Sequence, residues 1–304
     1  MLSLLSSGLK IIVYLLGTVL LAAILAPWFY WAGQHLSTIK SFAFLGDTDF
    51  ARYFNRSLLF SAFVLLIPVL RWIGLHQFTS LGLARNPRRI FHLAGGFVVA
   101  IAIVLGLGVC LLATEVSALK ESLPWNQLPR IFLTAIVVAV IEESLFRGAI
   151  LGLFRQSMRT LPAVVVTSAL FSILHFLKPP YDQNVDVHWY SGFQLLPQVF
   201  WRFSDPILLS GLFSSICILG LMLAHAAVKT RSLWLPIGIH AGVVFGKMSF
   251  SKLTHRTKDA MPWFGQDLTF GLGSLLILLF LWFLIWLLFL RGTAPSRPND
   301  QYAG

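Results

Sequence analysis

Eight apolar runs, most of them about as long as a membrane-spanning helix, divide the sequence. A helix needs about 20 mostly apolar residues to cross the hydrocarbon core of a bilayer. The runs cover residues 11–32, 57–75, 93–113, 131–154, 161–177, 207–227, 233–250 and 268–290. Only 12% of the residues are charged and 57% are hydrophobic, whereas a soluble domain carries about 25% charge. We therefore expect an all-α, polytopic transmembrane helix bundle with about eight spans, forming a single integral-membrane domain over residues 1–304.

The net charge of +11 is spread over short segments between the apolar runs. This placement is typical of membrane topology signals and of contact with anionic headgroups, so we expect membrane lipid and not nucleic acid as a partner. An even number of spans leaves both termini on one side, and the dense basic charge of the short loops there predicts the cytoplasmic side of the cell (inner) membrane. Residues 292–304 are rich in proline and polar side chains, which predicts a disordered tail.

The run 131–154 contains the sequence Ile141-Glu142-Glu143-Ser144-Leu145-Phe146-Arg147. A charged side chain at the centre of a membrane helix costs roughly 2.5–3.5 kcal/mol on insertion scales, so such residues are functional candidates by default. In a helix, Glu143 and Arg147 lie four residues apart and share a face, where they can form an ion pair. Glu142 lies about 100° around the helix from Glu143 and is left for other chemistry.

Two further runs each contain a histidine. His175 follows Phe171 by four residues, so the two rings share a helix face. His240 is surrounded by Gly238, Gly242 and Gly246, and small residues at this spacing let membrane helices approach closely. We expect the glycine stripe to press this helix against a neighbour, and the helix of the 131–154 run is the candidate.

One carboxylate and two imidazoles on three helices predict hydrolytic chemistry. A carboxyl group in an apolar environment can act as a general base near neutral pH, and a histidine can orient water or donate to an oxyanion. Water activated in this way would cleave a peptide bond without a covalent intermediate. The sequence lacks the His-Glu-x-x-His pattern of zinc proteases and the Gly-x-Ser-x-Gly pattern of serine hydrolases.

Taken together, the motifs resemble the CPBP family, which comprises CAAX proteases and bacteriocin-processing enzymes and is also called the Abi or type II CAAX endopeptidase family. The resemblance covers residues 131–250 and rests on Glu142-Glu143-x-x-x-Arg147, Phe171-x-x-x-His175, and His240 after Ser-Leu-Trp-x-Pro-Ile-Gly. Members act as intramembrane glutamate-type proteases.

The resemblance implies that Glu142 is the base that activates water, that His175 helps to hold that water, and that His240 lies on the oxyanion side. It implies supporting roles for Glu143, Arg147 and Phe171, no cofactor, and a membrane-associated or lipidated peptide or protein as substrate. The family pattern often has Asn four residues after the third-motif histidine, and this chain has Val244 there. Losing one oxyanion donor can cost about 10²–10³ in rate.

Two other interpretations use the same residues. Zinc accepts His and Glu ligands, and Glu142, His175 and His240 would supply the three protein ligands of a catalytic site. Alternatively, the chain is a non-enzymatic scaffold or immunity-type protein, an option that Val244 favours. The aromatic-rich loop 178–206 is either an interfacial belt or a lid that docks substrate.

Overall fold

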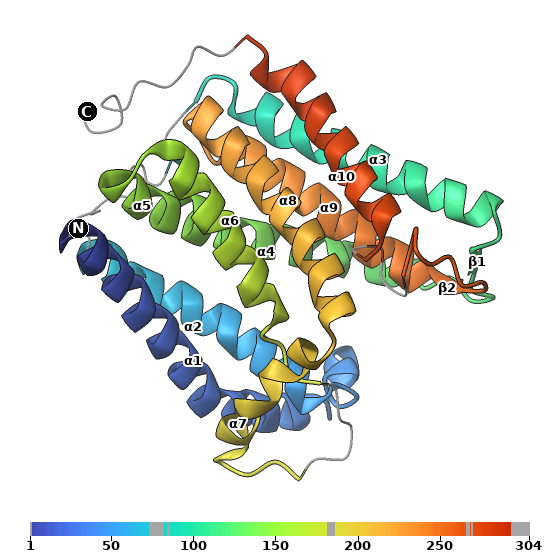
Figure 1. Cartoon of the computed structure of the whole chain (residues 1–304). Helices are drawn as coiled ribbons and strands as arrows, with labels where there is room; N and C mark the ends of the chain where they lie inside the picture. Colours follow the sequence, from blue (N-terminus) through green and yellow to red (C-terminus); the bar gives the residue numbers. More distant parts are fainter. Residues whose placement is uncertain are drawn as a thin grey trace. The chain divides into compact units, whose positions relative to one another are not determined.

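The computed structural model describes residues 2–72, 82–83, 86–180, 186–265, 268 and 270–292. The residues after 292, where we predict a disordered tail, lie outside this range, as do 73–75 at the end of the second predicted span. The described chain is a set of helices with one two-stranded sheet (Figure 1), which confirms the all-α prediction in its essentials. It forms two compact units: a first unit of Met1–Gly74 with Ile173–Leu209, and a second unit of Leu75–Ser172 with Ser210–Gly304.

The first unit is built on two long antiparallel helices. Helices α1 (Leu2–Leu36) and α2 (Phe50–Trp72) lie side by side and are joined by the 3-10 helix η1 (Lys40–Leu45) (Figure 1). The Tyr14 hydroxyl near the start of α1 donates to the carbonyl of Ala62 at 2.8 Å, which ties the two helices together. The unit also contains the short helices α7 (Ser191–Gln194) and η5 (Pro197–Ser204).

In the second unit, α3 (Arg89–Ala113) and α9 (Trp234–Leu253) pack in parallel along the glycine stripe. A Cβ on Gly238 would lie 2.2 Å from the Leu93 carbonyl oxygen, and one on Gly242 would lie 2.6 Å from that of Phe97. The stripe therefore faces α3, and the prediction that it faces the Glu142 helix is wrong. The reason is geometric: His240 is two residues from Gly238, so the two point to nearly opposite sides of α9.

Helix α4 (Leu128–Glu143) packs on a different face of α9. Ala139 of α4 lies in one buried cluster with Ile237 and Ala241 of α9, and Phe132 contacts Phe245 edge-on at 5.5 Å between ring centroids. These pairings run in opposite directions along the two helices, so α4 and α9 are antiparallel. Helix α9 is thus enclosed between α3 and α4, and its residues from Leu235 to Val243 are all buried.

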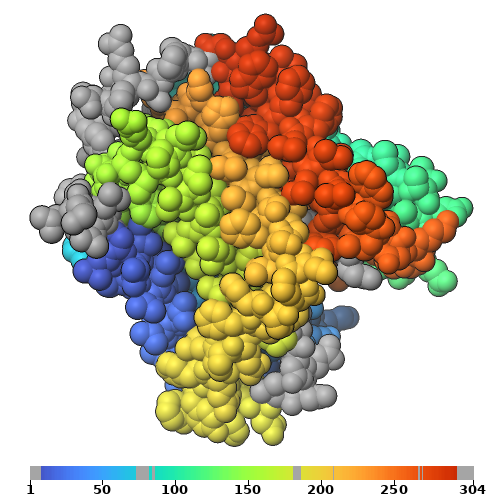
Figure 2. Space-filling view, viewed as in Figure 1, coloured from blue at the N-terminus to red at the C-terminus, as the bar shows by residue number. Residues whose placement is uncertain are grey.

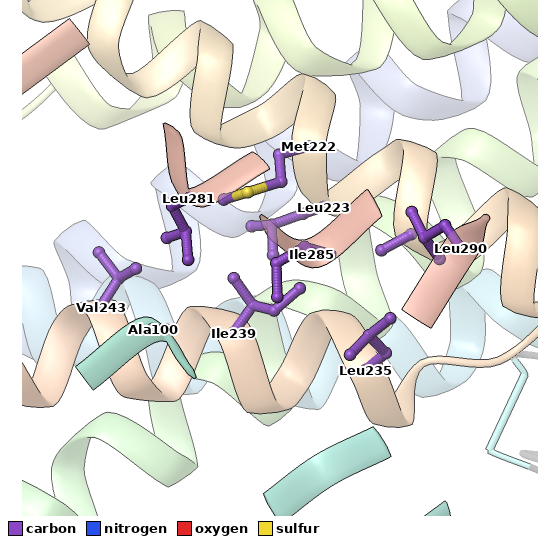
Figure 3. Packing of buried hydrophobic residues seen from close by; sticks show 10 residues of the cluster. Ala100, Met222, Leu223, Leu235, Ile239, Val243, Leu281, Ile285 and Leu290 are labelled. Atoms are coloured by element: carbon purple, nitrogen blue, oxygen red, sulfur yellow. The ribbon is translucent and has the colours of Figure 1, made fainter. Parts of the chain in front are cut away.

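The side of α9 that faces away from α4 contacts α8 (Pro206–Thr230), α10 (Leu272–Ile285) and the π-helix η6 (Trp286–Leu290). Figure 3 shows the apolar cluster that these helices form with α3, in which Met222, Leu223, Ile239 and Ile285 have no exposed surface. Trp282 Nε1 donates to His225 Nδ1 at 3.0 Å and so links α10 to α8.

A small antiparallel sheet joins the ends of α3 and α9. Its strands are β1 (Ser117–Leu119) and β2 (Thr254–Arg256), with Ser117 opposite Arg256. Because α3 and α9 run in parallel, the segments that follow them start at the same end and can pair. Three-residue strands leave no usable alternation in the sequence, which is why the sheet was not expected.

Among the described residues, five helices are long and apolar enough to cross a membrane. They are Gly8–Leu36, Phe50–Trp72, Arg89–Ala113, Leu209–Thr230 and Leu272–Leu290. The predicted count of eight is not confirmed. The other three runs do form helices: α6 (Thr160–Phe176) is apolar but short, α9 is made less hydrophobic by His240 and its lysines, and the 131–154 run carries the charged motif.

Candidate active site

The charged motif lies where an α-helix changes into a π-helix. Glu142 and Glu143 are the last two residues of α4, and the chain continues without a break into η4 (Ser144–Ile150), a π-helix that contains Arg147, and then into α5 (Leu151–Ser157). π-helical turns inside α-helices occur frequently at functional sites. All seven residues of η4 are buried.

Glu143 and Arg147 form the ion pair that their spacing predicts. Arg147 Nη1 donates to Glu143 Oε1 at 2.8 Å, and neither side chain has any exposed surface. Two further contacts hold the guanidinium: Nη2 donates to the Gly220 carbonyl of α8 at 3.3 Å, and the group lies 4.3 Å from the ring centroid of Phe171 on α6. Burial of this charge is thus compensated by a carboxylate, a carbonyl and an aromatic face.

Gly220 is the contact that the sequence did not reveal. A Cβ at this position would lie 3.1 Å from the Ser168 Cβ, so the glycine allows α6 and α8 to approach each other. The only signal in the sequence is a glycine within an apolar run, and such glycines are common in membrane helices.

His240 connects the two carboxylates. Its Nδ1 atom is 2.7 Å from Glu143 Oε1, and its Nε2 atom is 3.8 Å from Glu142 Oε2. A carboxylate only accepts hydrogen bonds, so we assign the Nδ1 proton to the bond with Glu143. That bond orients the ring with Nε2 toward Glu142. The ring also meets Phe171 edge-on, with the centroids 6.0 Å apart.

The Glu142 side chain is 18% exposed, whereas Glu143 and Arg147 are fully buried and His240 is nearly so. Two hydrogen bonds of ordinary length, about 2.8 Å each, together exceed the 3.8 Å that separates Glu142 Oε2 from His240 Nε2. The separation is therefore short enough for one water molecule to bridge the two atoms. The arrangement suits a carboxylate that receives a proton from water, beside an imidazole held by a second carboxylate.

The second unit thus brings together five of the six predicted residues. They come from α4, η4, α6 and α9, and they are Glu142, Glu143, Arg147, Phe171 and His240. His175 lies in the last turn of α6, is half-buried, and belongs to the first unit, so its part in the site stays a prediction. Val244, in place of the family's usual Asn, lies one turn after His240 on α9 and is half-buried.

The described residues include no group of three or more His, Cys, Asp or Glu side chains placed to hold a metal ion. The zinc interpretation needs His175 beside Glu142 and His240, and these residues belong to different units. It stays a prediction, to be tested by chelation.

Comparison with protein families gives a match over the part of the chain that contains the motifs. Residues 124–246, less than half of the chain, match the family model of the type II CAAX prenyl endopeptidase Rce1-like proteins. Searches of curated proteins and of solved structures give no significant match. The matched segment begins just before α4 and ends within α9, so it contains every candidate site residue. The match supports the resemblance of this segment to the CAAX protease family, and the five apolar helices support an integral membrane protein.

Proposed function

We propose that the protein hydrolyses peptide bonds at or within the membrane, with Glu142 as the general base that activates water. The observation that carries this proposal is the approach of Glu142 Oε2 to His240 Nε2, with His240 Nδ1 held by the buried Glu143. Glu142 is the more exposed of the two carboxylates, and Glu143 is already engaged by Arg147 and His240.

In the proposed reaction, Glu142 takes a proton from water while the oxygen attacks the scissile carbonyl carbon. The carbonyl oxygen becomes an oxyanion, and the proton is then delivered to the leaving nitrogen as the C–N bond breaks, giving a carboxylic acid and an amine and leaving Glu142 ionised again. An oxyanion donor role for His240 requires a proton on Nε2 as well as on Nδ1. With that proton, the cluster of Glu142, Glu143, Arg147 and His240 carries no net charge. His175 would help to hold the water, as the family resemblance implies.

For the substrate, we propose a protein or peptide with a prenylated C-terminal tail. This class follows from the description of the matching family and fits a protease embedded in lipid. The large apolar surface of α1, α3 and α10 supports lipid as the surrounding medium.

The test is cleavage of an internally quenched farnesylated peptide by the purified full-length protein in lipid nanodiscs. We expect Glu142→Gln to lower the rate by about 10²–10⁴, the range for loss of a general base, with an unchanged melting temperature. Glu121→Gln, at an exposed loop glutamate, is the matched control and should leave the rate unchanged. Full activity of Glu142→Gln would exclude the proposed base.

Two further experiments distinguish the proposal from a zinc protease and from a non-enzymatic protein. Loss of activity with a chelator and recovery with added zinc would favour a zinc protease. If the wild type cleaves no peptide, new protein termini are sought in membranes of cells that express the wild type or Glu142→Ala. Identical termini in both would favour the non-enzymatic interpretation that Val244 suggests.

For the orientation, we propose that both termini face the cytoplasm. His240 lies six residues into α9, about 9 Å along its axis, and so near the end of the second unit where α9 begins and α8 ends. Arg88, Arg89 and Lys229 flank the helices at that end, which fits a cytoplasmic face. A reporter that fluoresces only in the cytoplasm, fused to the C-terminus, should fluoresce. A fusion that is present at normal abundance but does not fluoresce would show that the C-terminus faces the opposite side of the membrane.

A further inference from the structure

The segment between α6 and α8 is fixed to the core of the first unit along one side. A Cβ on Gly192 would lie 1.9 Å from the Ala23 carbonyl oxygen, so α7 lies directly against the backbone of α1. Leu195 and Val199 are buried in one cluster with Ala23 and with Phe54 of α2. The segment is therefore a packed part of the unit and not a loose loop.

The other side of this segment is an exposed aromatic surface. Its side chains and their exposed fractions are Trp189 67%, Tyr190 38%, Phe193 37%, Phe200 56%, Trp201 43% and Phe203 41%. In the space-filling view this part of the chain lies at the molecular surface, in yellow (Figure 2). A water-exposed surface rarely carries so many neighbouring aromatic side chains unless something covers them.

The irregular backbone indicates that this surface does not lie in the hydrocarbon core of the bilayer. Around the aromatic side chains the chain forms turns, the four-residue α7 and the 3-10 helix η5. Irregular backbone exposed to lipid is not tolerated in the hydrocarbon region, because its polar groups find no partners there. The segment therefore belongs outside the hydrocarbon core, where its rings still need an apolar neighbour.

The side chains match the interface between headgroups and acyl chains. Tryptophan and tyrosine are enriched at that depth because their rings are apolar with a polar edge. The Arg202 guanidinium lies 5.3 Å from the centroid of the Trp201 ring, so a cation that can meet a lipid phosphate stands beside an aromatic anchor. Trp201 Nε1 donates to the Lys178 carbonyl at 3.0 Å, which fixes the ring in its exposed position.

The same end of the first unit carries further exposed aromatic side chains. Trp28 and Trp31 lie in the later part of α1, and Phe42 and Phe44 lie in η1, which connects α1 to α2. The contacts of α7 with α1 and of η5 with the start of α2 place the segment at this end of the helix pair. One end of the unit is therefore bordered by aromatic side chains from three separate parts of the chain.

We propose that the segment from Trp189 to Phe203 lies flat in the bilayer interface and anchors the end of the α1–α2 pair in one leaflet. The partner is the headgroup and upper acyl region of the lipid bilayer. The anchor accounts for an aromatic surface that the hydrolytic site does not use, and it does not depend on the proposed function.

The test is nitroxide scanning of the full-length protein in nanodiscs. Cys110 and Cys217 are replaced by alanine, and single cysteines for labelling are introduced at Phe200 and Phe203. Two reference labels are added. A label at Glu121, in an exposed loop, gives the collision rates in water, and a label at Val98, exposed in the middle part of α3, gives the collision rates among acyl chains. We expect the ratio of oxygen to nickel-chelate collision rates at Phe200 and Phe203 to fall between those of the two references.

Collision rates equal to those at Glu121 would place the segment in water and overturn the proposal in favour of a lid. Rates equal to those at Val98 would place it in the hydrocarbon core and also overturn it. Should the cysteine-free protein fail to fold, the wild type is compared with Trp189→Phe and Trp201→Phe by fluorescence quenching with lipids brominated at different depths. We expect the signal lost on each substitution to be quenched most by bromine at the top of the acyl chain. A signal that no bromine position quenches would overturn the proposal.

Discussion

Replacing Arg147 by methionine tests whether the buried cluster is held together by charge compensation. The side chains of Arg147 and Glu143 have no exposed surface and are joined at 2.8 Å, so the substitution leaves a buried carboxylate that keeps its hydrogen bond to His240 and loses its guanidinium. Removing one member of a buried pair costs about 3–5 kcal/mol, because the remaining charge is uncompensated. Against a total stability of about 5–15 kcal/mol, this loss is large.

The double variant Glu143→Gln with Arg147→Met removes both charges, and a glutamine carbonyl still accepts from His240 Nδ1. We therefore expect the double variant to be more stable than Arg147→Met alone. Arg147→Lys should recover little, because one ammonium group does not reproduce the guanidinium's simultaneous contacts with Glu143, Gly220 and Phe171.

The assay is reversible unfolding in mixed micelles with increasing sodium dodecyl sulfate, with Arg89→Met as the control at an exposed arginine. Free energies of unfolding are measured for the wild type, for Glu143→Gln, for Arg147→Met and for the double variant, and together they complete a thermodynamic cycle. If Arg147→Met stays within about 0.5 kcal/mol of the wild type, the usual range of surface substitutions, the charge-compensation argument is refuted. A double variant less stable than Arg147→Met would refute it as well.

Three other predictions concern packing, catalysis and surface charge. Gly238→Ala should destabilise the protein by about 1–3 kcal/mol through overpacking, whereas Gly106→Ala, where a Cβ meets nothing within 4 Å, should not, as thermal unfolding of both will show. Val244→Asn, one turn after the site histidine, should raise kcat with little change in KM if an amide can reach the oxyanion; an unchanged kcat would argue that another donor already serves. Lys258 lowers the pKa of the exposed Glu115 carboxyl through a hydrogen bond and charge attraction, so Lys258→Met should raise that pKa in a ¹³C carboxyl titration. The pair therefore helps folding above the unfolded-state pKa and loses this effect as the pH falls through the lowered folded-state pKa.

Local spacing predicted the parts of the site that lie within one helix. The Glu143–Arg147 pair follows from a separation of four residues, and the structure contains it. Contacts between helices did not follow in the same way, because spacing gives the face of a residue and not the neighbour that covers it. The glycine stripe was therefore assigned to the wrong helix, and neither the Glu143–His240 bond nor the Gly220 carbonyl was foreseen.

The predicted count of eight spans stays unconfirmed for a related reason. The three predicted runs that do not qualify as spans by length and apolarity are the ones that contain the site residues: the 131–154 run, α6 and α9. Helix α9 packs against α3, α4 and the α8–α10 cluster, so protein and not lipid surrounds much of it. A helix enclosed in this way can contain His240 without exposing it to acyl chains.

Hydropathy therefore underestimates the helices that carry chemistry, because the burial that makes a polar site tolerable is supplied by neighbouring helices and not by the segment itself. The apolar helices and the helices of the site therefore differ in what identifies them. The apolar helices α3 and α10 can be recognised one at a time from composition. The site can be recognised only when α4, α6, α8 and α9 are considered together, since Arg147 is held both by Glu143 of the same continuous helix and by the Gly220 carbonyl of α8.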